Sequence, residues 1–94
     1  MKWLEIIELR TVDCNRELLE SQLQKLINEL NKEAKLQAAK VYNRILLNTD
    51  FSIHLVHESQ EIESNGSTLG LHLISSLKQF GLINHSVWAE MQGK

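Results

Sequence analysis

The spacing of the apolar residues switches between two periods along this chain, and the order of the switches is what most limits the fold. Residues 3–12 are rich in β-branched and aromatic types and predict a strand. Leucines up to Leu30 then recur at steps of three and four, which predicts an amphipathic helix. The scheme repeats afterwards, with alternation at 41–47 and 51–55, a helical stripe at 67–80 and alternation at 85–91.

The predicted order is strand, helix, strand, strand, helix, strand, which is the ferredoxin-like split βαβ arrangement. Right-handed crossovers place both helices on one face of a four-stranded antiparallel sheet. With 94 residues, the chain is expected to form a single domain over residues 1–94 with one modest core. The fold class is therefore α+β, and one face of the sheet is left without helices.

Local signals place the helix ends. Asn15 and Ser67 are residues of types that cap helix N-termini, and we expect them to cap the first and the second helix. Gly81 follows the second stripe, and we expect it to adopt the left-handed conformation while Leu82 folds back on Leu77 as a Schellman stop.

Two features of the pattern stay open. Residues 36–44 could continue the first helix instead of starting a strand. The leucine stripe could also form a coiled-coil seam, although fewer than three heptads favour packing on a sheet. The polar stretch 57–66 ends in Asn-Gly and is interpreted as a loop.

Composition excludes several classes of protein. The chain has 10 basic and 12 acidic residues and a formal charge of −2. No stretch concentrates lysine and arginine enough to neutralise several nucleic-acid phosphates. A lone cysteine rules out an internal disulfide framework. Early charges argue against a signal peptide, and no apolar run could span a bilayer, so we expect a cytoplasmic protein without nucleic-acid or membrane partners.

Alternation also sorts side chains between the two faces of the sheet. The consistently apolar parity is assigned to the helix side: Val41, Ile45, Leu47, Phe51, Ile53, Leu55, Val87, Ala89 and Met91. The opposite parity carries Tyr42, Arg44, Leu46, Ser52, His54, Val56, Trp88 and Glu90. The first strand is undecided between the set of Leu4, Ile6, Glu8 and Arg10 and the set of Trp3, Glu5, Ile7 and Leu9.

The open face mixes aromatic, apolar and charged groups, and such a face usually meets another surface. At this point the chain resembles the dimeric α/β-barrel proteins, which include the antibiotic-biosynthesis monooxygenases. The resemblance rests on the element order and on the segments "WLEIIEL", "LGLHLISSLKQFGL" and "HSVWAEM". It implies a homodimer whose sheets face each other across a space for an aromatic substrate or, in some members, haem. No motif fixes catalytic residues, so none is carried over.

The candidate ligand-binding residues on this face are Tyr42, Arg44, His54, Trp88 and Glu90. The arginine would hold an anionic oxygen, the histidine or tyrosine would move a proton, and the tryptophan would form a flat apolar wall. The alternative is that these aromatic residues fill a dimer core while Arg44 pairs with Glu90 or Glu8, because interfaces favour the same residue types.

Other candidate sites are weaker. His54 and His57 are three apart on a strand and so face opposite ways, which argues against a shared metal ion. No metal and no cofactor are expected, although either histidine could serve as an axial ligand if haem were bound. Cys14 precedes a helix but has no base near it in sequence, and Gly70 lies outside any phosphate-loop spacing.

Two hypotheses about function follow. In the first, a homodimer binds a small aromatic or apolar molecule between its sheets, with cofactor-free oxidation as the reaction that the resemblance implies. In the second, the dimer is a regulatory or structural module without enzymatic activity. The sequence leaves open whether the protein is an enzyme, because a cavity between the sheets distinguishes the two hypotheses.

Overall fold

The computed structural model describes residues 1–12, 16–32 and 36–91, and it has the predicted order of elements. The elements are β1 (Lys2–Thr11), α1 (Arg16–Leu30), β2 (Leu36–Asn43), β3 (Asp50–Glu58), α2 (Thr68–Leu77), a short 3-10 helix η1 (Lys78–Phe80) and β4 (Gly81–Ala89). Cys14 and Asn15 lie outside the described residues.

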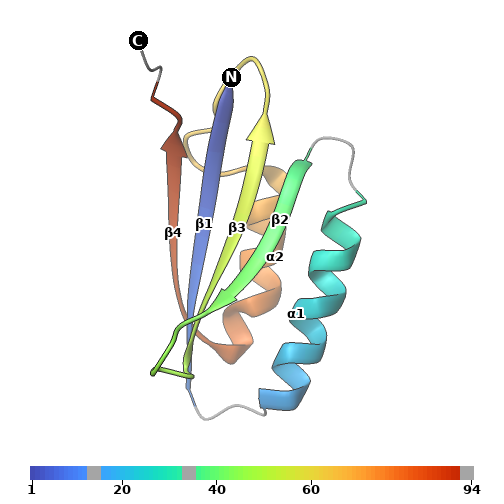
Figure 1. The fold of residues 1–94 in the computed structure, drawn as a ribbon, viewed down its shortest axis with the longest axis vertical. Helices are drawn as coiled ribbons and strands as arrows, with labels where there is room; N and C mark the ends of the chain where they lie inside the picture. The colour runs from blue at the N-terminus through green and yellow to red at the C-terminus, as the bar shows by residue number, and fades with distance from the viewer. Residues whose placement is uncertain (13–15, 33–35, 92–94) are drawn as a thin grey trace.

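The strands form one antiparallel sheet in the order β2-β3-β1-β4. Both helices cover the same face of this sheet, as Figure 1 shows, and the ferredoxin-like prediction is confirmed. Among the described residues, no helix covers the opposite face. In the part of the chain that the structure describes, no helix is long and apolar enough to cross a membrane.

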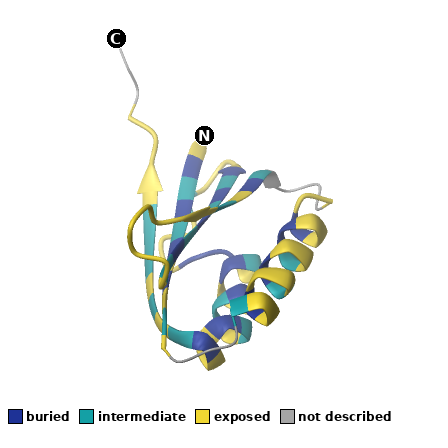
Figure 2. Ribbon diagram, turned by 60° about the horizontal axis from the view of Figure 1, so that its bottom comes forward, coloured by how far each residue is buried: buried dark blue, intermediate teal, exposed yellow. Residues whose placement is uncertain are grey.

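The core lies between the helices and the two central strands. Ile7 and Leu9 of β1 and Ile53 and Leu55 of β3 are almost fully buried beneath the helices. Figure 2 shows buried helix faces turned to the sheet and exposed faces turned away. The buried leucine stripe of α1 therefore packs on the sheet, and the coiled-coil alternative is wrong.

The sequence left open which side of strand β1 faces the helices, and the structure decides it. The helix side takes the set that contains Trp3, Glu5, Ile7 and Leu9, all of which are buried. This choice places one carboxylate, that of Glu5, inside the core.

The β2–β3 hairpin corrects one prediction. Strand β2 ends at Asn43, which pairs with Phe51, so Ile45 and Leu47 lie in the connecting loop and are 79% and 46% exposed. The helical alternative for residues 36–44 is also wrong. Alternation continued past the true strand end because cross-strand pairing, rather than composition, sets where a strand stops.

The entry into β4 corrects a second prediction. The strand begins at Gly81 and ends at Ala89, and Gly81 is extended rather than left-handed. Leu82 is 70% exposed and makes no Schellman contact, and Met91 lies beyond the strand at 90% exposure. The helix is ended instead by one 3-10 turn, after which the chain pairs with β1 at once.

The start of α2 is as predicted, but the segment before it is not. Ser67 caps the helix by accepting a hydrogen bond from the Gly70 backbone N–H at 2.9 Å. Strand β3 runs on to Glu58, so His57 belongs to the strand and not to the predicted loop 57–66. This extension turns the His57 side chain into the core.

Candidate functional site

Within the strands, the open face carries the parity that the sequence assigned to it, but Arg44, Leu46 and Glu90 lie beyond the ends of β2 and β4. Its members on the strands include Leu4, Ile6 and Glu8 of β1, Lys40 and Tyr42 of β2, Ser52, His54 and Val56 of β3, and Asn84, Ser86 and Trp88 of β4. His54 and His57 lie on opposite faces, as predicted: His57 is buried under the helices, whereas His54 is half-buried on the open side.

One end of the open face is apolar. Leu4 pairs with Trp88 on one side and with Val56 on the other, so the three side chains form one row across the sheet. A hollow of about 260 Å³ lies over this row, and Glu90 also lines it. Trp88 is 57% exposed and its indole N–H donates to Ser86 Oγ at 2.8 Å. The row offers a flat apolar surface with a carboxylate at its edge.

The middle of the face holds a titratable pair. The rings of Tyr42 and His54 are 4.7 Å apart and tilted by 56°. His54 Nε2 lies 3.0 Å from Ser52 Oγ. His54 pairs with Ile6, whose row is the next one along from Leu4 and Val56, a step of about 7 Å. A proton-transfer group therefore stands beside the apolar row.

Arg44 lies at the far end of the face from Glu90. Its guanidinium is 3.3 Å from Asp50, and not beside Glu90 or Glu8 as the alternative interpretation had it. A second hollow of about 330 Å³ is lined by Arg44 together with Tyr42 and Asp50. The structure thus brings Tyr42 close to His54 and Arg44, and separately brings Trp88 close to Glu90.

Asp50 is held by two arginines. The Arg10 guanidinium donates to this carboxylate at 3.2 Å and is the main reason that the pKa of Asp50 lies below its ordinary value of 3.8. Hydrogen bonds from Thr49 and Arg44 act in the same direction. Asp50 is therefore an ionised anchor for the base of the hairpin.

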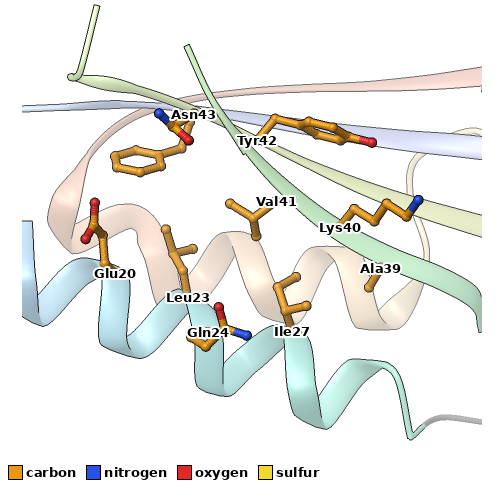
Figure 3. A pocket seen from close by; sticks show the side chains of 10 residues that line it. Glu20, Leu23, Gln24, Ile27, Ala39, Lys40, Val41, Tyr42 and Asn43 are labelled. Atoms are coloured by element: carbon orange, nitrogen blue, oxygen red, sulfur yellow. The ribbon is translucent and has the colours of Figure 1, made fainter. Parts of the chain in front are cut away.

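A groove between α1 and β2 lies on the helix side, with a volume of about 510 Å³. Leu23 and Ile27 of α1 face Val41 of β2 across it, as Figure 3 shows. The rim carries Glu20 and Lys40. Its apolar walls could accept a small apolar group, and none of the described residues that line it is a histidine or a cysteine.

The helix side also contains a buried cluster that sequence reasoning missed, formed by Glu5, His57, His85 and Ser67. Glu5 is 0% exposed, and both of its carboxylate oxygens accept hydrogen bonds. His57 Nε2 is 2.6 Å from Oε1, and His85 Nε2 is 2.8 Å from Oε2. The Ser67 backbone N–H donates to Oε2 at 3.2 Å, and the Ser67 hydroxyl donates to Oε1.

Close packing surrounds this cluster. A Cβ atom at Gly70 would lie 2.2 Å from Glu5 Oε2, and one at Gly66 would lie 2.4 Å from His85 Cε1. The Trp3 ring stacks on His57 with centroids 4.0 Å apart. The Glu5 carboxylate therefore lies within hydrogen-bonding distance of four donor groups and is closed off from solvent.

The missed residues left a faint signal in the sequence. Glu5 shares its parity with Trp3, Ile7 and Leu9, and a lone carboxylate in an otherwise apolar set indicates a buried polar site. His57 was hidden by the prediction of a loop. Among the residues that the structure describes, no group of three His, Cys, Asp or Glu side chains is arranged to hold a metal ion.

Solved structures share this fold over nearly the whole chain. Rv0793 from Mycobacterium tuberculosis matches with a TM-score of 0.74 and 14% identity, covering 99% of this chain and 98% of that one. SnoaB from Streptomyces nogalater, described as a cofactor-independent oxygenase, matches with a TM-score of 0.73 and 9% identity, covering 98% and 95%.

A third match is a protein from Nitrosomonas europaea that is provisionally named an antibiotic biosynthesis monooxygenase. Its TM-score is 0.74 at 6% identity, over 96% of this chain and 90% of that one. The resemblance is confirmed as one of fold. At these identities, the match says nothing of the reaction. No family model and no curated protein matches the sequence.

Proposed function

We propose that this protein binds a small aromatic or apolar molecule on the open face of its sheet, within a homodimer, and oxidises it with molecular oxygen without a cofactor. The observation that carries the proposal is the apolar row of Leu4, Val56 and Trp88 standing one step from the His54–Tyr42 pair. The likeness in fold to SnoaB, a cofactor-independent oxygenase, supports it. A cytoplasmic location stays a prediction of the sequence.

A second copy of the chain would complete the site. The hollow over the apolar row is about 260 Å³, slightly below the usual range of about 300–1,000 Å³ for small-molecule pockets. Trp88 and Tyr42 are 57% and 49% exposed on the same face, and Leu46 at the tip of the hairpin is 97% exposed. A second sheet placed over this face would bury these groups and close the hollow.

The reaction needs no electron source besides the substrate. A carbon with two hydrogens beside an aromatic ring loses a proton to the His54 imidazole, and the resulting carbanion passes electrons to oxygen. One oxygen atom stays as the carbonyl of the product and the other leaves as water, so that R₂CH₂ and O₂ give R₂C=O and H₂O. Trp88 supplies the wall that orients the ring.

Tyr42 and Glu90 have supporting roles in this proposal. Tyr42 lies 4.7 Å from the His54 ring and would return the proton, while Glu90 edges the apolar hollow. Binding of a substrate anion by Arg44 stays a prediction, because its guanidinium already forms an ion pair with Asp50.

The second candidate is a dimer without enzymatic activity. It is favoured because two polar groups of the open face already have partners within the chain. Arg44 is paired with Asp50, and the Trp88 N–H donates a hydrogen bond to Ser86. In this case, side chains of the partner would fill the space between the sheets.

The test combines ligand binding with turnover. The purified protein is screened by thermal shift against hydroxylated polycyclic aromatics and quinols, and the hits are followed in an oxygen electrode. A ligand at 100 times its dissociation constant adds about 2.7 kcal/mol, which is a shift of several degrees in a domain of this size.

Variants separate binding from chemistry. We expect His54→Gln to keep the thermal shift and lose oxygen uptake, and Trp88→Ala to lose both. His72→Gln on the exposed side of α2 is the matched control and should behave as the parent protein. Absence of any shift and of any uptake across the panel would favour the non-enzymatic dimer.

A further inference from the structure

We propose that the loop between β2 and β3, residues 44–49, docks on a second copy of this chain and closes the hollow over that copy's Leu4, Val56 and Trp88. The inference rests on the homodimer of the proposed function. It goes further because it states which part of the partner completes the site. By two-fold symmetry, each copy gives its loop to the other and receives one in return.

The loop presents apolar side chains to solvent. Ile45 is 79% exposed and Leu46 is 97% exposed. Leu46 also has a φ of 74°, a left-handed conformation that is unfavourable for a residue with a side chain. The Asp50 backbone N–H donates to the Leu47 carbonyl at 3.2 Å and helps to hold the loop in this shape. Leu46 is therefore kept in a costly conformation although its side chain has almost no burial within its own chain, which points to a contact outside the chain.

The hollow lies too far from the loop of the same chain for the two to meet. Leu4 and Arg10 are six residues apart on β1, which spans about 20 Å at about 3.3 Å per residue. Arg10 pairs with Asp50, the first residue after the loop. Figure 1 shows the loop at the end of the sheet opposite the two chain termini, whereas Leu4 and Trp88 lie near the termini in sequence. The loop can therefore reach this hollow only on another chain.

A two-fold axis across the middle of the open face brings the two ends together. On β1, Leu4 is three residues to one side of Ile7 and Arg10 is three residues to the other side. If the axis lies between two facing sheets and crosses the strands at the level of Ile7, the Arg10 end of one copy lies over the Leu4 end of the other. In Figure 1, β2 slants across the sheet so that the loop lies on the side of β4, the strand that contributes Trp88 to the hollow.

Charges at the two ends complement each other. Arg44 begins the loop, its side chain is 59% exposed, and it lines a hollow with Tyr42 and Ser52 of the open face. One guanidinium nitrogen donates to Asp50 at 3.3 Å, which leaves N–H groups for a further acceptor. Glu90 lines the hollow over the apolar row and forms no ion pair with the described residues. In the two-fold arrangement, Arg44 of each copy pairs with Glu90 of the other and directs the loop to this hollow.

Leu46→Gly separates a contact with a second copy from a role inside the chain. Glycine adopts a positive φ without strain, so the far-UV circular dichroism spectrum of the variant should equal that of the parent. The lost side chain should nevertheless raise the dissociation constant of the dimer about tenfold, as measured by sedimentation velocity. Leu71→Ala, an exposed position on α2, is the control and should leave this constant unchanged.

Charge reversal tests the pairing of Arg44 with Glu90. Arg44→Glu and Glu90→Arg should each raise the dissociation constant about tenfold, because two-fold symmetry doubles every repulsion. The variant with both changes should return to within about threefold of the parent. Lys25→Glu combined with Glu90→Arg has the same net charge as that variant and should bind as weakly as Glu90→Arg alone.

A disulfide bond locates the loop directly. The chain with Cys14→Ser, Leu46→Cys and Val56→Cys should, on oxidation, link position 46 of one copy to position 56 of the other. Mass spectrometry of the joined peptides identifies the bond. The two positions are about 20 Å apart along the face of one chain, too far for a disulfide within it.

The outcomes distinguish this inference from the proposed function. A link between positions 46 and 56 together with a weaker dimer of Leu46→Gly supports the inference. A dimeric parent that forms no such link, with a dissociation constant that Leu46→Gly does not change, overturns the docked loop and leaves the proposed homodimer standing. A parent that is monomeric at every concentration measured overturns both.

Discussion

Three glycines of this chain lie so close to a neighbouring atom that a side chain would not fit. Gly70 and Gly66 face Glu5 and His85, and Gly81 faces the backbone of β1. A Cβ atom at Gly81 would lie 2.0 Å from the carbonyl oxygen of Arg10. At Gly81 the requirement is therefore close approach between two strands, whereas Gly66 also has a positive φ of 103°.

Gly81→Ala tests this requirement. We expect a loss of about 1–3 kcal/mol in the free energy of unfolding, because the added methyl group must push β4 away from β1. Chemical denaturation with circular dichroism gives the value. Leu82→Ala is the control, since Leu82 is 70% exposed and should change stability by no more than about 0.5 kcal/mol. Equal values for both variants would contradict the collision.

Asp50 provides a pH-dependent test. Its pKa in the folded protein lies below 3.8, chiefly because of the hydrogen bond from Arg10. The carboxylate therefore contributes stability above its unfolded pKa, and that contribution disappears as the pH falls through the folded pKa.

We expect Arg10→Gln to raise the pKa of Asp50 toward its ordinary value, as measured by NMR titration of the side-chain carboxyl carbon. The stability difference between parent and variant should shrink as the pH falls below 3.8. Lys25→Gln on the exposed side of α1 is the control for loss of one positive charge. An Asp50 pKa that does not move would remove Arg10 as the main cause.

At the scale of elements, α2 depends on its first turn. The helix has 10 residues, a length at which an isolated helix is marginal in water. Ser67 accepts from Gly70 as a cap and also donates to the buried Glu5. One side chain thus starts the helix and ties it to β1.

Ser67→Ala should lower the free energy of unfolding by about 1–3 kcal/mol, because it removes a cap and a hydrogen bond to a charged group. Hydrogen exchange should show faster opening of the Gly70 backbone amide in the same variant. Ser64→Ala, in the exposed part of the preceding loop, should stay within about 0.5 kcal/mol of the parent. If the two serine variants proved equally stable, Ser67 would not anchor the helix.

At the scale of the whole molecule, the two faces of the sheet differ in kind. The helix face is closed by the core and contains the Glu5 cluster. The open face shows Trp88 at 57% exposure beside Leu4, and the hairpin tip adds Leu46 at 97%. We propose that these exposed apolar groups form the surface that meets the second copy of the chain.

Trp88→Ala should shift the proposed homodimer toward monomer at micromolar concentration. Light scattering coupled to size-exclusion chromatography measures the mass, and sedimentation velocity checks it. Leu71→Ala removes an apolar side chain of similar exposure, 49%, from α2 and should leave the mass unchanged. A mass for the Trp88 variant equal to that of the parent would take Trp88 out of the interface.

Local pattern alone determined the element order, the ferredoxin-like topology and the parity of β3. Each of these depends on the spacing of apolar residues along a short segment, as in Phe51, Ile53 and Leu55. The Ser67 cap was predictable for the same reason, because its partner Gly70 is three residues away.

Tertiary structure decided what depends on partners far away in the chain. The end of β2 at Asn43 follows from pairing with Phe51, and Gly81 is needed because Arg10 lies against it. Glu5 meets His57 and His85 across 52 and 80 residues of sequence. Periodicity can tell on which face a side chain lies, but only the register between strands decides which distant side chains meet there.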